Sequence, residues 1–151
     1  MTTAVMGGGT WGTTFAQVLC DAGTDTVLWC RRPGQAARIL ASRQNTDYLP
    51  GVTLPDALAV TADPRVAMDG ADTVVFAVPS QSLRENLERW VPVIPPGATL
   101  VSLIKGIELR THKRMTEVIA EVTGRPAGQI AVITGPNLAH EIAERQYAAT
   151  V

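Results

Sequence analysis

The sequence predicts an α/β fold with a doubly wound, mostly parallel sheet. Strand-like apolar runs alternate with segments of helical spacing along the 151 residues, and the links between them are short. The run VVFAV at 74–78 is apolar throughout, which is typical of a strand covered on both faces of a parallel sheet. The first strand-like run ends directly in three glycines, and helical periodicity follows. The chain is therefore expected to begin with a strand, a tight turn and a helix.

Six strands are expected where β-branched, aromatic or continuously apolar runs are bounded by turn residues. They lie at residues 4–6, 26–30, 58–61, 73–78, 98–103 and 129–134. A seventh strand is expected to start at 148–151. The segment 44–57 contains two prolines and a glycine, so an extended connection is expected there.

Helices are expected between the strands, over residues 11–22, 33–41, 64–68, 111–122 and 137–145. Asp63 and Asn137 are the expected N-caps of two of them. Ser82 and Glu85 fit a capping box that opens a further helix containing Trp90. Gly124 is expected to end the helix before it.

Ligands of such sheets bind beyond the carboxyl ends of the strands. Five segments of this chain occupy that position, at 7–12, 30–32, 78–82, 105–106 and 135–137. Four of the five contain Gly, Ser, Arg or Lys residues suited to anions. The sequence thus predicts an anion-binding edge.

Composition narrows the function class. Thirteen basic and 14 acidic residues leave a net charge of −1, so no long-range field attracts nucleic acid or a membrane surface. No apolar run is long enough to span a bilayer, and the first residues lack the features of a signal peptide. Cys20 and Cys30 show neither a metal nor a disulfide pattern, and two buried reduced thiols are expected. A cytoplasmic protein without a metal site is expected.

Gly7, Gly9 and Gly12 form a G-x-G-x-x-G motif between the first strand and the first helix, as in Rossmann-type domains. Gly7 would form the tight turn, Gly9 would let a pyrophosphate approach the backbone, and Gly12 would let helix and strand pack closely. The free N–H groups of the helix would favour the phosphate charge. A glycine-rich turn without a ligand is the alternative.

Arg31 and Arg32 follow the second strand, where NAD-binding domains usually carry an acid. A carboxylate would repel a 2′-phosphate, whereas a guanidinium can bind it through charge-assisted hydrogen bonds. NADP is therefore expected as the preferred cofactor, with NAD second. The alternative is that both arginines are only solvated surface charge.

Lys105 follows an apolar strand and should emerge at the same edge, where an ammonium can hold an anionic substrate or polarise a carbonyl. The turn at 135–137 would present backbone N–H groups. A surface lysine and a capped turn are the alternatives. His112 and His140 are expected on helices, with no acidic or cysteine partner at ligand spacing.

The chain resembles bacterial-type NAD(P)-dependent glycerol-3-phosphate dehydrogenases in six segments, in order and at the family's spacing: VMGGGTWGTTFA, LWCRR, YLPGV, FAVPSQ, SLIKGIE and VITGPNLAHEIA. The resemblance covers essentially all of residues 1–151. It implies hydride transfer between NAD(P)H and dihydroxyacetone phosphate, giving sn-glycerol 3-phosphate for phospholipid synthesis.

The resemblance also implies residue roles. Thr10, Trp11 and Ala139 would contact the cofactor, and Arg31 with Arg32 would hold the adenosine ribose phosphate. Lys105 would meet both cofactor and substrate. Gly135 and Asn137 would contact the substrate, although relatives often carry Ser or Thr where this chain has Asn137.

In this family a helical domain after the nucleotide domain supplies the acid–base lysine and most of the phosphate-binding residues. The expectation is that residues 1–151 are a dinucleotide-binding domain, incomplete at its C-terminus and without that catalytic domain. Alone it would bind cofactor without efficient turnover, and the full-length protein could be a homodimer. A non-catalytic NADP-binding module and a dehydrogenase for another small hydroxy acid are the alternatives.

Overall fold

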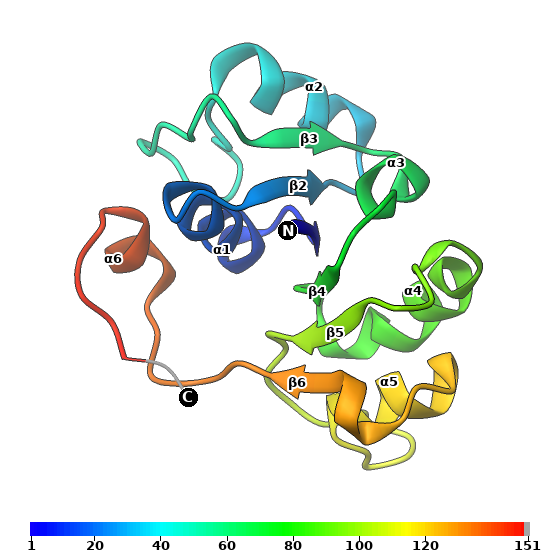
Figure 1. Cartoon of the computed structure of the whole chain (residues 1–151). Helices are drawn as coiled ribbons and strands as arrows, with labels where there is room; N and C mark the ends of the chain where they lie inside the picture. Colours follow the sequence, from blue (N-terminus) through cyan, green and yellow to red (C-terminus); the bar gives the residue numbers. More distant parts are fainter. Residues whose placement is uncertain (150–151) are drawn as a thin grey trace.

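A single parallel sheet forms the centre of the molecule in the computed structural model, which describes residues 1–149 (Figure 1). The described strands are β1 (Thr2–Met6), β2 (Asp25–Trp29), β3 (Ala59–Thr61), β4 (Thr73–Phe76), β5 (Thr99–Ser102) and β6 (Ile130–Val132). Their order is β3-β2-β1-β4-β5-β6, and every neighbouring pair is parallel. The chain therefore reverses its direction of travel across the sheet between β1 and β4. This arrangement confirms the predicted doubly wound fold.

Helices cover both faces of this sheet. They are α1 (Thr10–Asp21), α2 (Pro33–Ser42), α3 (Pro64–Met68), α4 (Leu83–Trp90), α5 (Met115–Thr123) and α6 (Ala139–Ala143). Short 3-10 turns at Ser80–Ser82, Val91–Val93 and Ala127–Gln129 flank α4 and precede β6.

Alternate residues of β1 enter two separate cores. Ala4 and Met6 belong to one apolar cluster, and Val5 belongs to the other. The Ala4 cluster includes an aromatic group in which Trp90 meets Trp29 edge-on, with ring centroids 5.1 Å apart, and stacks on Phe76 at 6.0 Å. Because β1 is buried on both faces, its carboxyl end is held rigidly where the glycine-rich turn begins.

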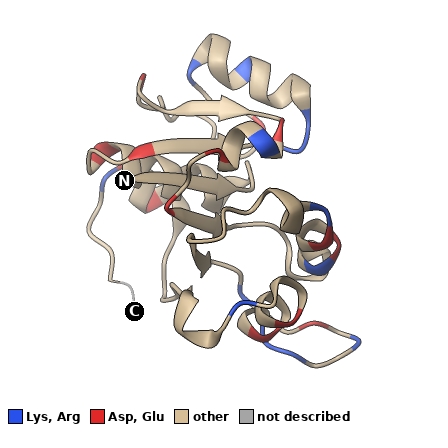
Figure 2. Ribbon diagram, turned by 45° about the vertical axis from the view of Figure 1, so that its right-hand side comes forward, with Lys and Arg blue, Asp and Glu red and all other residues tan. Residues whose placement is uncertain are grey.

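Charged residues of both signs are interspersed over the outer helices and loops (Figure 2). The sheet carries few of them. This distribution agrees with the near-zero net charge. No helix among residues 1–149 combines the length and the apolar character needed to cross a bilayer.

Several predicted element boundaries differ from the structure. The helix expected at 111–122 begins only at Met115, because residues 107–114 form a turn in which His112 has a φ of 56°. His112 therefore lies outside the helix, whereas His140 lies on α6. The strand expected at 73–78 ends at Phe76, two residues early.

Of the three predicted N-caps, one is confirmed, one is wrong and one is correct only in its position. Ser82 occupies the N-cap position of α4, but its hydroxyl donates back to the Pro79 carbonyl and makes no capping hydrogen bond, so the predicted capping box is absent. Leu138, not Asn137, is the N-cap of α6, which ends at Ala143. Asp63 caps α3, accepting a hydrogen bond from the Arg65 backbone N–H at 2.8 Å.

The last expected strand, over 148–151, falls partly outside the described residues. Residues 148 and 149 have no regular secondary structure, and residues 150 and 151 are not described.

Candidate functional site

The glycine-rich turn joins β1 to α1, and two of its glycines are required by close packing. A Cβ at Gly7 would lie 2.4 Å from the Ala77 carbonyl oxygen, and the φ of Gly7 is +146°. A Cβ at Gly12 would lie 1.9 Å from the Gly7 carbonyl oxygen. Only glycine fits at either position, since real Cβ contacts this short do not occur.

Gly9 differs from its neighbours. It has extended backbone angles, φ −81° and ψ −176°, which any residue adopts. A Cβ there would meet nothing within 4 Å. Gly9 is also the N-cap of α1, which has no side-chain cap and no acidic residue in its first turn. The N-terminus of α1 thus opens onto unfilled space with its positive dipole end.

Gly8, the middle glycine of the turn, is held by two buried side-chain amides that the sequence did not predict. The Gly8 carbonyl accepts hydrogen bonds from Gln35 Nε2 at 2.6 Å and from Asn45 Nδ2 at 3.0 Å. Asn45 also donates to Thr13 Oγ1 at 2.8 Å, so it ties the turn to α1. No spacing pattern in the sequence indicated these contacts.

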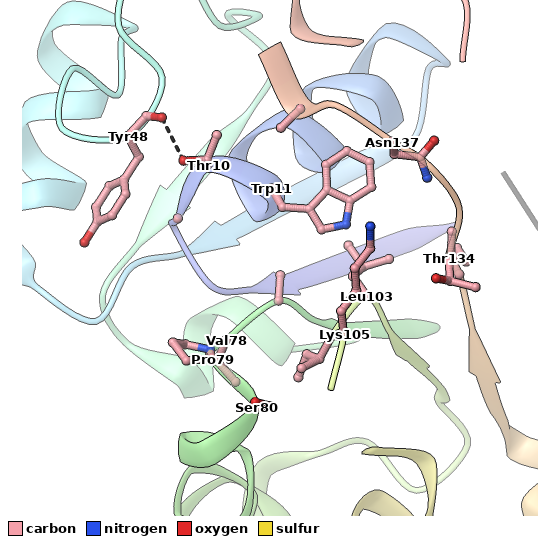
Figure 3. A pocket seen from close by; sticks show the side chains of 15 residues that line it. Thr10, Trp11, Tyr48, Val78, Pro79, Ser80, Leu103, Lys105, Thr134 and Asn137 are labelled. Carbon is pink, nitrogen blue, oxygen red and sulfur yellow. Dashed lines mark hydrogen bonds between the residues drawn. The ribbon is translucent and has the colours of Figure 1, made fainter. Parts of the chain in front are cut away.

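A cleft runs along the carboxyl edge of the sheet in two parts. The narrower part, about 170 Å³, lies between the glycine turn and the arginines at 31 and 32. The wider part, about 500 Å³, contains Trp11, Lys105 and Asn137 (Figure 3). Both parts share Gly9, Tyr48 and the segment 77–79. They therefore form one elongated site centred on the N-terminus of α1.

Arg31 and Arg32 leave β2 at the narrow end. Both are exposed and line that part of the cleft. Arg32 forms an ion pair with Asp47, Nη2 to Oδ2 3.1 Å, and its guanidinium carbon lies 5.9 Å from the centre of the Tyr48 ring. The Tyr48 carbonyl in turn accepts a hydrogen bond from Thr10 Oγ1 at 2.9 Å. Tyr48 lines both parts of the cleft, although no sequence pattern assigned it a role.

Lys105 joins two loops at the wide end. It follows β5, and its Nζ donates to the Gly135 carbonyl at 3.0 Å, which links it to the turn after β6. Asn137 and Ala139 line the same space. In Figure 3 the Lys105 ammonium points toward the Trp11 ring and Asn137.

The structure brings nearly all predicted site residues to this cleft. Nine of them line it: Gly7, Gly9, Thr10, Trp11, Arg31, Arg32, Lys105, Asn137 and Ala139. Gly135 contributes as the hydrogen-bond partner of Lys105. Gly12 is buried behind the turn and acts through packing. Neither His112 nor His140 lines the cleft.

The loop that carries Lys105 is attached to α4 by a charged pair. Arg84 donates from Nε and Nη2 to the two oxygens of Glu108, at 2.8 and 2.9 Å. Hydrogen bonds from Arg84 and then Thr111 lower the pKa of Glu108 to about 2. The Gln81 amide adds two backbone contacts, donating to the Ile107 carbonyl at 2.9 Å and accepting from the Leu109 N–H at 3.1 Å.

The cysteines have no visible role in the site. Both are free; Cys30 is buried, and Cys20 is only partly buried, which corrects the expectation of two buried thiols. Burial raises the pKa of the Cys30 thiol to about 11 and also raises that of Cys20, so neither is an activated nucleophile. Among residues 1–149 no three His, Cys, Asp or Glu side chains are grouped as metal ligands.

Comparison with known proteins matches residues 2–151 to the family described as the N-terminus of NAD-dependent glycerol-3-phosphate dehydrogenase. The chain belongs to this family. It is 58% identical over 150 residues to glycerol-3-phosphate dehydrogenase [NAD(P)+] 2 of Mycobacterium bovis, covering 99% of this chain and 45% of that protein. It is also 58% identical over 148 residues to glycerol-3-phosphate dehydrogenase [NAD(P)+] of Corynebacterium glutamicum, again covering 45% of the relative. The chain thus spans about half the length of the curated relatives it matches.

A solved structure supports the same family assignment. The crystal structure of glycerol-3-phosphate dehydrogenase from Coxiella burnetii superimposes with a TM-score of 0.90 at 28% identity. The match covers 99% of this chain and 45% of that one. The sequence-based resemblance to glycerol-3-phosphate dehydrogenases is therefore confirmed.

Proposed function

We propose that this chain is the cofactor-binding part of an NAD(P)-dependent glycerol-3-phosphate dehydrogenase. The enzyme interconverts dihydroxyacetone phosphate and sn-glycerol 3-phosphate, a precursor of phospholipids. The observation that carries the proposal is the elongated cleft at the uncapped N-terminus of α1, where Gly9 leaves room for a ligand. Family membership then selects the reaction.

The residues present fit a dinucleotide. The N-terminus of α1 and the open space at Gly9 suit a pyrophosphate, since helix N–H groups and dipole favour its charge. Arg31 and Arg32 suit the adenosine ribose and a 2′-phosphate at the narrow end. The wide end has room for the nicotinamide beside Trp11. When bound, the nicotinamide cofactor supplies or accepts the hydride.

Lys105 orients and polarises the substrate in this proposal. Its ammonium lies at the wide end, where it places a positive charge beside a carbonyl oxygen that becomes negative during reduction. Its hydrogen bond to the Gly135 carbonyl uses one of its three protons and leaves two for substrate. Gly135 and Asn137 would complete the contacts to substrate, and Ala139 would contact the cofactor.

In the proposal, the part of the full-length relatives that this chain does not span has a separate role. Residues 1–151 form the dinucleotide-binding domain, and a following helical domain supplies the acid–base lysine and most of the phosphate-binding residues. A cytoplasmic location and a homodimer of the full-length protein stay predictions.

The direct test is NADPH oxidation by the full-length protein with dihydroxyacetone phosphate, which the proposal expects to observe.

A second test addresses the pyrophosphate site. Gly9→Val should abolish binding of NADPH and NADH because its side chain fills the space for the pyrophosphate, while the thermal midpoint stays close to the parent value. Gly97→Val is the matched control, since a Cβ at Gly97 also meets open space, far from the cleft along β5.

Two results would contradict the proposal. Retained cofactor affinity in Gly9→Val would reject the pyrophosphate site. Tight cofactor binding without any turnover of dihydroxyacetone phosphate would instead favour a non-catalytic NADP-binding module, or a dehydrogenase for another hydroxy acid.

The arginine pair gives a third test. Replacing Arg31 and Arg32 with alanine should weaken NADPH far more than NADH, because each charge-assisted hydrogen bond contributes about 1.5 to 3 kcal/mol. Isothermal titration with both cofactors measures this. An equal loss for both would show that the arginines do not bind the 2′-phosphate.

A further inference from the structure

Two arginines share a single carboxylate beside the narrow end of the cleft. Asp47 Oδ2 accepts from Arg32 Nη2 at 3.1 Å and from Arg38 Nη2 at 2.6 Å. Arg32 is the N-cap of α2, Arg38 lies within that helix, and Asp47 lies on the segment that returns toward β3. The Asp47 side chain is 37% exposed, so water and ions reach the cluster.

Arg31 and Arg32 differ in their partners. Both line the cleft, but only Arg32 is neutralised by an acid; within residues 1–149, Arg31 forms no ion pair. Asp47 and Arg38 do not line the cleft themselves. The carboxylate therefore contacts Arg32 without lining the ligand space itself.

We propose that Asp47 is the counter-ion that Arg32 exchanges for the 2′-phosphate of NADP(H), and that this exchange determines the selectivity between NADPH and NADH. The inference rests on the proposed function of the cleft. With NADH bound, Arg32 keeps Asp47 as its partner, so the absence of a phosphate leaves no cation unpaired. With NADPH bound, Arg32 turns to the phosphate and Arg38 retains Asp47.

The electrostatics give the direction of the effect. Asp47 reduces the charge of the two arginines that it pairs with, Arg32 and Arg38, from +2 to +1, which weakens the attraction for a phosphate dianion. Arg38 strengthens the attraction for the phosphate instead. Because Arg38 stays paired with Asp47, Arg32 can give up its own contact with Asp47 more easily. Replacing Asp47 and replacing Arg38 should thus shift the preference between NADPH and NADH in opposite directions.

The test measures dissociation constants of NADPH and NADH for full-length variants. Asp47→Asn should raise the preference for NADPH over NADH about three- to tenfold, as expected for removing one charge at contact range in a solvated site. Arg38→Met should lower the same preference by a few-fold. Both changes should shrink in high salt, because the cluster is exposed.

Asp56→Asn is the matched control. Asp56 lies on the same connecting segment and pairs with Arg43 at 3.6 Å, away from the cleft. This variant should leave the cofactor preference unchanged. Circular dichroism and thermal midpoints check that all three variants fold.

Specific results would overturn the inference. An unchanged or lower NADPH preference in Asp47→Asn would show that Asp47 only positions Arg32. A shift of the same sign in Arg38→Met and Asp47→Asn would also reject the exchange. If the parent protein binds neither cofactor, the proposed function itself fails, and that outcome is distinct from the first two.

Discussion

Two loops face each other across the cleft, and they are supported by different kinds of contact. The glycine turn is held at the Gly8 carbonyl by Gln35 and Asn45, which are 5% and 1% exposed. The Lys105 loop is held by the pair of Arg84 and Glu108, whose side chains are 28% and 12% exposed. One support is neutral and buried, and the other is charged and within reach of water.

This difference predicts how each loop responds to change. A buried amide that loses its partner cannot turn to water, so the full cost of desolvation remains. A charged pair near the surface gains less from its contact, but water replaces a missing partner. The phosphate end of the site should therefore be intolerant of substitution, and the substrate end more adjustable.

The largest difference is expected between Gly12 and Gly106. Gly12→Ala should destabilise the protein by about 3 kcal/mol or more, because a Cβ 1.9 Å from the Gly7 carbonyl forces the backbone apart. Gly106→Ala should cost about 1 to 2 kcal/mol, mainly for its φ of +118°. Urea unfolding of both variants measures the difference, and equal costs would contradict the tighter packing of the glycine turn.

A smaller effect is expected at Asn45. Asn45→Leu keeps the branched skeleton of the side chain but removes the hydrogen bonds that Asn45 donates to Gly8 and to Thr13, so about 2 to 3 kcal/mol of stability should be lost. The loss should not depend on salt. Gln44→Leu, one residue earlier, is the control and should be nearly neutral. A salt-dependent loss at Asn45 would be inconsistent with a neutral buried contact.

Arg84 should be less sensitive. Arg84→Met removes the paired hydrogen bonds to Glu108, and we expect about 1 kcal/mol of lost stability, decreasing as salt is added. Arg89→Met is the control, because within residues 1–149 Arg89 forms an ion pair only with Glu85, one helical turn away, and it is far more exposed. A loss at Arg84 as large as that at Asn45 would remove the contrast between the two supports.

The pH dependence gives the smallest expected effect. The folded-state pKa of Glu108 lies at about 2, below its ordinary value of 4.5, so the carboxylate stabilises the fold above pH 4.5. This contribution is lost as the pH falls from 4.5 toward 2. The stability advantage of the parent over Glu108→Gln should shrink in that window, as unfolding at pH 7, 4 and 3 would show. An advantage that grows in acid would contradict the pairing.

The parts of this site that the sequence predicted are those encoded locally. The glycine spacing, the arginines after β2 and Lys105 after β5 each follow a strand directly, so the fold class places them at one edge. Tyr48, Asn45 and Gln35 were not predicted because they lie far along the chain from the glycine turn: Gln35 reaches it from α2, and the other two reach it from the segment between α2 and β3. Asn45 and Gly8 are 37 residues apart in sequence. No local periodicity encodes such a contact.

Side-chain hydrogen bonds also explain the late start of α5 and the missing side-chain cap of α4. Thr111 bonds to Glu108 and so favours the turn before α5 over an earlier helix start. Ser82 likewise bonds backward to Pro79. In both places a short polar side chain has two local partners to choose from, and tertiary contacts decide between them.

The positions of the three tryptophans have an optical consequence. Trp29 and Trp90 are 7% and 2% exposed and in mutual contact, whereas Trp11 is only partly buried and lines the wide end of the cleft. A soluble quencher such as acrylamide should reach the Trp11 indole first. Emission from this single side chain would then report occupancy of the nicotinamide end, and the aromatic pair in the core would provide a constant internal reference.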